Sequence, residues 1–472
     1  MRTVLVNPLG FDRPASFRDY LRRVRSVALG ARRYQGRETL TNPTATAKSS
    51  GYYVVFVLFG AIILSYLDRG IVNVLVPDLR RSLDLSEVEV SLIQGFSFSL
   101  FFALAGLPLG TLVDRCNRRL IIVLGVAAWS AMTMLCGMAQ DFWQLFAARA
   151  GVGAGEACLL PAAYSIVGDI FSAERRGRPM SLLAVATTVG GASSSLIGGG
   201  ILKVLGGHTA ADVPLFGLVE VWRICFFVAG SPGIAMVLII MTFREPDRTA
   251  RNLAIEADGS YIAYIIRHWR TLVPLYLAFG LVFMFCYASA NWAPTALIRT
   301  YNYSAADAGL AVGLTVGPSS IFGGLLGGLL GDWLAKQKRR YGRLRAWFGS
   351  NIPAAAGGAC ILTDGPHWLF LLGVMLVMGS GATLGSLSYP ALYDAVPQNY
   401  RGRAVAIYML IGSIFGIGIG TTLVAMLTEY ILQNDVMVNI SIGAVVIIAA
   451  ILSPLLVFAQ FRSYENLRTG LA

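Results

Sequence analysis

The chain has few charged residues: only 14% of its 472 residues are Asp, Glu, Lys or Arg, whereas 56% are hydrophobic. A soluble globular protein contains about 25% charged residues, which cover its surface. A soluble chain of this length would form two or three domains, and each domain would need such a surface. The composition therefore excludes a soluble multidomain protein and indicates a protein that lies in lipid.

Cysteine and histidine are also scarce. The six cysteines never form a CxxC pair, and the three histidines show no metal-ligand spacing. Glycine runs such as Gly198–Gly200 lack the lysine of a phosphate-binding loop. We therefore expect no disulfide framework, no metal site and no bound cofactor. No apolar segment near the start precedes a small-residue cleavage site, so no cleaved signal peptide is expected.

Long apolar runs are abundant. A helix needs about 20 mostly apolar residues to cross a bilayer, and barrel strands would be shorter and alternating. By this measure the sequence predicts an all-α integral membrane protein with twelve transmembrane helices, at residues 51–76, 88–109, 119–138, 143–170, 180–203, 222–243, 272–298, 305–332, 346–364, 367–392, 403–430 and 436–460. These helices divide into two halves of six, and the expected regions are a basic arm (1–50), an N-terminal half (51–243), a charged linker (244–271), a C-terminal half (272–460) and a tail (461–472).

The positions of the positive charges predict the orientation. If the N-terminus is cytoplasmic, 31 of the 38 Lys and Arg residues fall on the cytoplasmic side, where such residues accumulate. We therefore expect both termini on the cytoplasmic side of the membrane. The net charge of +12 is then an orientation signal and does not indicate a nucleic-acid partner. A stripe of Phe17, Leu21 and Val24 in the arm fits an amphipathic helix on the membrane surface, and disorder, an early start codon or a presequence are alternatives.

The two halves repeat short motifs in the same order and at similar offsets. Gly110–Asp114 returns as Gly328–Asp332, Pro161–Tyr164 returns as Pro390–Tyr393, and Arg176–Arg178 returns as Arg401–Arg403. Such internal repeats are typical of transporters in which two pseudo-symmetric halves enclose the binding site and rock about it.

The loop after the second predicted span reads Gly110-Thr-Leu-Val-Asp114-Arg115-Cys-Asn117-Arg118-Arg119. It resembles the motif G-x-x-x-D-R-x-G-R-R of the major facilitator superfamily, and the resemblance extends over residues 51–460. Asn117 stands where that family has Gly, and asparagine is the residue that best tolerates the left-handed backbone expected there.

Two further segments are similar to the bacterial Spinster (sphingosine-1-phosphate transporter-like) branch of the superfamily, and this resemblance implies a bacterial inner membrane. Ser65-Tyr66-Leu67-Asp68-Arg69 resembles N-Y-x-D-R, with Ser65 for the usual Asn, and Arg149-Ala-Gly-Val-Gly-Ala-Gly-Glu156-Ala resembles R-G-L-V-G-V-G-E-A. Symporters of organic anions and protons in the same superfamily carry similar patterns.

Four charged residues lie deep within the predicted spans, away from the span ends: Asp68, Arg69, Arg149 and Glu156. Each such charge costs about 2.5–3.5 kcal/mol at the membrane centre and needs a partner. Arg149 and Glu156 are two helical turns apart and share one face, and the resemblance implies that spans 1 and 4 line one cavity. Our hypothesis is that protonation of Asp68 or Glu156 frees Arg69 or Arg149 to bind an anionic headgroup. The alternative is that buried ion pairs merely join the two spans.

The second half carries no deep charge and is rich in aromatic residues, which suits the apolar tail of an amphiphile. Expected cavity contacts are Phe98, Phe102, Met284, Tyr287, Asn291, Trp292 and Tyr389. The family motif implies a cytoplasmic gate that latches the outward-open state without contacting substrate, made by Gly110, Asp114, Arg115, Arg118, Asp169 and Arg178.

The leading prediction is therefore a non-enzymatic secondary transporter that works by alternating access. It would couple protons to the movement of an anionic amphiphile such as a lysolipid or a sphingosine phosphate, and it would act as a monomer among membrane lipids. One alternative is a proton-coupled symporter of small organic anions, and an alternative of another class is a membrane receptor or enzyme on a transporter-like fold.

Overall fold

The computed structural model describes residues 45–472, apart from 173–174, 176, 205–209, 214–216, 247–260, 337–341, 398–399, 461–462, 465–466 and 468–472. Most of the expected basic arm and much of the expected linker and tail lie outside the described residues. The chain divides into Met1–Tyr52 and Tyr53–Ala472, and the description below concerns the second unit.

The described chain is almost entirely helical. The first group of elements is α2 (Ala45–Leu83), α3 (Glu87–Ser91), η1 (Leu92–Phe96), α4 (Ser97–Arg115), α5 (Arg118–Cys136), α6 (Phe142–Glu156), α7 (Leu159–Ile170), α8 (Gly177–Val204), β1 (Ala210–Val213), β2 (Gly217–Glu220), α9 (Val221–Gly230) and α10 (Pro232–Ile240). The second group is α11 (Tyr261–Arg267), α12 (Trp269–Tyr301), α13 (Ala305–Lys336), α14 (Gly342–Leu362), α15 (His367–Ala395), α16 (Arg401–Ile411), η4 (Gly412–Gly420), α17 (Thr421–Met426), η5 (Leu427–Leu432), η6 (Asp435–Met437) and α18 (Val438–Phe458).

Eleven helical segments in the described chain are long and apolar enough to cross a membrane. Several consist of successive elements, such as α6 with α7, or α16 followed by η4, α17 and η5. The predicted ninth span is helix α14, which has 21 residues but begins with arginines and contains Asn351, so it is less apolar. The predicted all-α membrane fold is confirmed. The antiparallel hairpin of β1 and β2, between α8 and α9, was not expected.

The turn before α5 corrects one expectation. Asn117 does not adopt a left-handed backbone: its φ is −63° and its ψ is 111°. Its side chain instead accepts a hydrogen bond from the Leu120 N–H at 2.8 Å and caps the amino end of α5. Asparagine satisfies this position because it is a favoured N-cap residue, whereas glycine has no side chain with which to cap.

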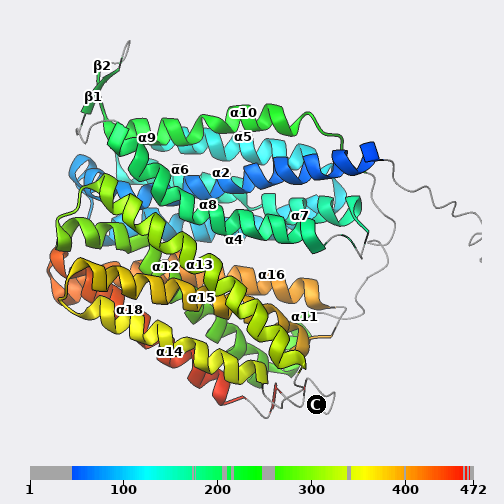
Figure 1. The fold of residues 1–472 in the computed structure, drawn as a ribbon. Coiled ribbons are helices and arrows are strands. Elements are labelled where there is room, and N and C mark those ends of the chain that lie inside the picture. Colours follow the sequence, from blue (N-terminus) through cyan, green and yellow to red (C-terminus); the bar gives the residue numbers. More distant parts are fainter. Residues whose placement is uncertain are drawn as a thin grey trace, which may run out of the picture. The chain divides into compact units, whose positions relative to one another are not determined.

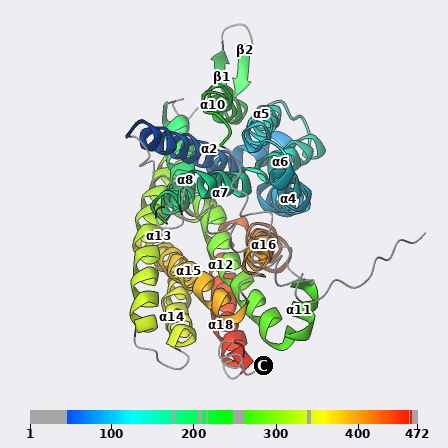
Figure 2. The same cartoon turned by 90° about the vertical axis from the view of Figure 1, so that its right-hand side faces the viewer.

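The helices gather into two groups that meet along a seam. Figure 2 shows α2 to α10 on one side and α12 to α18 on the other, with α8 and α13 side by side between them. At this seam a Cβ atom on Gly199 would lie 2.6 Å from the carbonyl oxygen of Ala306, so only glycine allows the helices to approach this closely.

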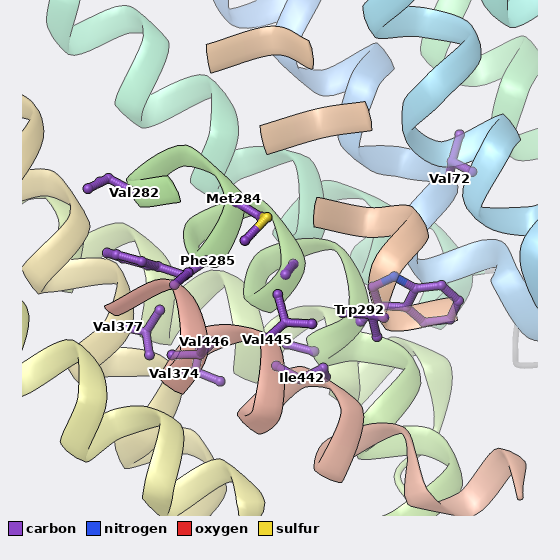
Figure 3. Close-up of a cluster of buried hydrophobic side chains, with 14 of the residues drawn as sticks. Val72, Val282, Met284, Phe285, Trp292, Val374, Val377, Ile442, Val445 and Val446 are labelled. Carbon is purple, nitrogen blue, oxygen red and sulfur yellow. The ribbon is translucent and has the colours of Figure 1, made fainter. Parts of the chain in front are cut away.

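The second group has its own apolar core. Phe285 of α12 points toward Val377 of α15 and Val446 of α18 (Figure 3). The three side chains are fully buried. This packing holds α12, which carries several of the residues of the second group that face the candidate site.

Candidate functional site

The structure brings the four membrane-depth charges together where α2 packs against α6. Arg69 Nε donates to Glu156 Oε2 at 2.6 Å. Arg149 is held by the main chain instead: its Nη1 donates to the carbonyl oxygen of Asp68 at 3.1 Å, and its Nε to that of Ile93 at 3.4 Å. The glutamate is therefore paired with Arg69 from the neighbouring helix rather than with Arg149 from its own helix.

Two carboxyl groups in this cluster have unused oxygens. Asp68 is fully buried, and within the described chain neither of its carboxyl oxygens has a hydrogen-bond partner. Glu156 Oε1 lacks a partner in the same sense. An arginine stays charged at any physiological pH, whereas a carboxyl group can lose its charge by binding a proton. These two acids are therefore the groups that could carry protons.

Aromatic rings support the two guanidinium groups. The Cζ atom of Arg69 lies 4.6 Å from the ring centre of Phe98, 5.1 Å from that of Phe102 and 4.5 Å from that of Tyr66. The Cζ atom of Arg149 lies 5.8 Å from the Phe98 ring. Cation–π attraction of this kind stabilises a desolvated guanidinium, so Arg69 can remain in place when its carboxylate partner is neutral.

A cavity of about 300 Å³ lies between the two helix groups beside this cluster. Both arginines line it from the first group, and Asp68 and Glu156 stand behind them outside the wall. The second group contributes an uncharged wall, which includes Val282, Phe283 and Met378. The cavity is therefore cationic on one side and largely apolar on the other.

The expected cavity contacts separate into two sets. Phe98, Tyr287 and Asn291 line the cavity, whereas Phe102, Met284, Trp292 and Tyr389 are not part of its wall. Phe102 stacks behind Phe98, with ring centres 5.5 Å apart. The Trp292 indole is fully buried and donates to the Thr421 carbonyl oxygen at 2.9 Å. The sequence alone did not predict these orientations, because a residue's position along the sequence does not reveal how its helix is rotated.

Several polar residues of the wall were missed, including three from α2 and η1. Tyr66, Asn73 and Gln94 line the cavity. Asn73 could have been found, because it lies four residues after Arg69 and therefore on the same helix face. It is also separated from Asn291 by the same offset that separates Gly110 from Gly328 in the repeated loop motif.

The expected gate residues lie at the far end of α4. Arg118 is buried and pairs with Asp169 and with Glu245, the latter at 2.7 Å, so it joins α5, α7 and the segment after α10. All three belong to the first helix group. Gly110 has open space around it, and Arg115 and Arg178 are exposed. The side chain of Asp114 lies outside the described part of the structure.

The opposite end of the bundle, which we call the closed end, is formed by the loops at 84–86, 302–304 and 433–434 (left in Figure 1). Ion pairs join the two helix groups there. Arg80 Nη1 contacts Glu87 Oε1 and Asp435 Oδ2, each at 2.6 Å, and Arg299 also pairs with Glu87. Glu87 is only 1% exposed, so water screens its two ion pairs weakly.

Replacing Glu87 by Gln should loosen the closed end. The substitution preserves the shape of the side chain but removes the charge that attracts Arg80 and Arg299, and losing one partner of a buried pair is costly. We expect the distance between spin labels at Asp84 and Ser304, in a background without the native cysteines, to shift toward longer values. Asp78→Asn, which breaks a pair with Arg81 inside α2, is the matched control and should leave the distance unchanged. An unchanged distance in Glu87→Gln would contradict a gating role.

The family model of the Major Facilitator Superfamily matches residues 58–421. The chain belongs to this superfamily. Its members are transporters, and the long apolar helices described above make this chain a multi-pass membrane protein.

Individual superfamily members show how far the similarity extends. An MFS-type efflux pump of Mycolicibacterium smegmatis is 26% identical over 376 residues, which cover 78% of this chain and 82% of that protein. A probable L-galactonate transporter of Escherichia coli is 30% identical over 298 residues, and the match covers 60% of this chain and 62% of that protein.

A crystal structure of a bacterial homolog of the human lysosomal transporter Spinster, in an inward-facing and unoccupied conformation, has a TM-score of 0.75 and 25% identity. The alignment covers 89% of this chain and 98% of that one. The resemblance to the Spinster branch is thereby confirmed.

Proposed function

We propose that this protein is a proton-coupled secondary transporter that moves an anionic amphiphile by alternating access. The proposal depends mainly on the ion pair between Arg69 and Glu156, in which Arg69 lies on the cavity wall and Glu156 lies behind it. A proton on Glu156 would weaken the pair and release the planar guanidinium to form two parallel hydrogen bonds with a carboxylate or phosphate. Asp68, which has no hydrogen-bond partner among the described residues, would serve as a second proton carrier.

The shape of the cavity supports an amphiphilic substrate. Its charged wall is formed by α2 and α6 and its apolar wall by α12, α13 and α15, so a headgroup and a short length of tail would face different helix groups. Apolar tail contact would contribute about 25 cal/mol for each Å² removed from water.

The orientation follows from the positive loops. If both termini are cytoplasmic, the closed end with its ion pairs faces outward, and this structure represents an inward-facing state. Its similarity to an inward-facing crystal structure supports that assignment. We place the protein, as a monomer, in a bacterial inner membrane.

A second candidate is transport of a small organic anion. Its support is the cavity volume of about 300 Å³, which lies at the lower end of the range of about 300–1,000 Å³ for ligand pockets. The similarity to a probable L-galactonate transporter points in the same direction. The same two arginines would bind the carboxylate. The family match favours both transport candidates over the alternative of a receptor or an enzyme.

Flux through proteoliposomes distinguishes the candidates. The purified full chain would be reconstituted and offered lysophosphatidic acid, a sphingosine phosphate or L-galactonate at pH 6 and at pH 7.5, with and without a proton gradient. Gradient-driven movement of the lipids, but not of the aldonate, is the expected result. Movement of the aldonate alone would favour the second candidate, and gradient-independent flux of every compound would overturn proton coupling.

A further inference from the structure

A chain of buried hydrogen bonds crosses from one helix group to the other at the wall of the cavity. Gln94 Nε2 donates to Asn73 Oδ1 at 3.2 Å, and Asn73 Nδ2 donates to Asn291 Oδ1 at 3.0 Å. Asn291 Nδ2 then donates to Thr421 Oγ1 at 3.0 Å. Every step runs in the same direction, from Gln94 of η1 toward α17.

The centre of this chain is a symmetric pair. Asn73 and Asn291 are as far apart along the sequence as Gly110 and Gly328, the first residues of the repeated loop motif. They therefore occupy equivalent places in α2 and α12, and each is 7% exposed. At the position equivalent to Arg69 the second half has Tyr287. The repeated asparagines thus join the halves, whereas the charge exists on one side only.

One acceptor at the start of this hydrogen-bond chain is unused. Gln94 lines the cavity and is 3% exposed, and in the described part of the structure its Oε1 has no hydrogen-bond partner. The oxygens of Asn73, Asn291 and Thr421 each accept a bond from the preceding member of the chain. An unpaired buried carbonyl oxygen is destabilising, so a ligand that offers it a donor from the cavity binds more tightly.

We propose that Gln94 Oε1 accepts a hydrogen bond from a hydroxyl group of the transported anion, and so selects hydroxylated over deoxy anions. This proposal rests on the proposed function, because it takes Arg69 and Arg149 as the site of the anionic group. Gln94 and Asn73 are hydrogen-bonded, and Asn73 lies one helical turn, about 6 Å, beyond Arg69 on α2. The substrate is therefore an anion whose hydroxyl lies a few bonds from its phosphate or carboxylate.

The orientation of Gln94 makes this selection possible. In the structure Asn73 Oδ1 holds the amide nitrogen of Gln94, and Asn73 donates through its own amide to Asn291, so Gln94 can reverse its amide without losing a bond only if both asparagines turn with it. Hydrogen bonds in such a chain polarise one another. In this arrangement the oxygen is the group of Gln94 that lacks a partner, so a ligand that offers only acceptors is disfavoured.

Matched ligands test the proposal. Binding of lysophosphatidic acid and of its 2-deoxy analogue to the purified full chain would be measured by isothermal titration, and so would binding of L-galactonate and of hexanoate. In the wild type we expect the hydroxylated member of whichever pair binds to have about tenfold higher affinity. Equal affinity within that pair overturns the hydroxyl site and leaves the proposed function intact. If no member of either pair binds, the proposed function falls and this inference falls with it.

Variants of Gln94 test whether this residue causes the preference for the hydroxylated ligand. Gln94→Met keeps the volume but removes the amide, so the ratio between the two affinities should fall from about tenfold to about one. Gln94→Asn, a shorter amide, keeps the fold testable if the methionine variant is unstable, and it should reduce the preference. Asn351→Leu removes a buried amide that donates to the Trp347 carbonyl oxygen, outside the cavity, and should preserve the preference. A preference that survives in both Gln94 variants overturns the proposal.

Discussion

Glu156→Gln should abolish proton-driven accumulation of substrate while preserving exchange of substrate across the membrane. In the structure one oxygen of Glu156 pairs with Arg69 at 2.6 Å and the other has no partner among the described residues. Glutamine has nearly the same shape but cannot gain or lose a charge. It therefore holds Arg69 permanently in the released state that protonation would otherwise produce. We expect the gradient-driven accumulation ratio to fall at least tenfold and the exchange rate to lose its dependence on pH.

The control for this experiment carries the same change of charge elsewhere. Asp364 is exposed in the loop after α14, and Asp364→Asn should accumulate substrate like the wild type. Asp68→Asn should weaken coupling as well, because Asp68 is the other buried acid with unused oxygens. The melting temperature of each variant separates lost coupling from lost folding. If Glu156→Gln and Asp68→Asn both retained wild-type accumulation, the cluster would only join α2 to α6.

Gly95→Ala should prevent the two halves from closing over the cavity. A Cβ atom on Gly95 would lie 1.9 Å from the carbonyl oxygen of Ile417, far inside van der Waals contact, and this oxygen belongs to the backbone, so it cannot turn aside as a flexible side chain could. Gly313, the counterpart of Gly95 at the offset of the repeated loop motif, is also crowded: its Cβ would lie 2.4 Å from Leu196 Cγ and 3.1 Å from the carbonyl oxygen of Ala192. Since neither backbone segment can shift by itself to relieve the overlap at Gly95, η1 and η4 must move apart.

We expect this variant to lose at least 90% of its transport rate and to show longer distances between spin labels at Asp84 and Ser304. Gly106→Ala is the matched control, since Gly106 lies in the adjoining α4 and nothing stands within 4 Å of its Cβ position. Alanine there should even stabilise the helix by about 0.5–1 kcal/mol. Wild-type transport in Gly95→Ala would show that the halves do not need this contact to close.

Much of the architecture could be predicted from local patterns. The bilayer thickness sets how long an apolar run must be, so the apolar runs alone located the helices, including α14 at residues predicted to cross. Arg149 and Glu156 were recognised as a pair on one face because helical periodicity is local. The backbone of Asn117 was predicted wrongly, because a loop motif does not distinguish a left-handed turn from an N-cap.

The sequence by itself determined that the protein lies in a membrane, that its two halves repeat and that four charges are buried. The amino-acid composition, the lengths of the apolar runs and the offset between the repeated motifs were enough, because each can be counted or read from residues close in sequence. The partners of those charges were not determined in this way. The partners depend on how helices distant in sequence are rotated and aligned against one another. This alignment decides that Arg69 pairs with Glu156, that Arg149 binds main-chain oxygens and that Asn73 contacts Asn291. Packing of the whole bundle sets that alignment, because the side chains of all the helices must interdigitate at once.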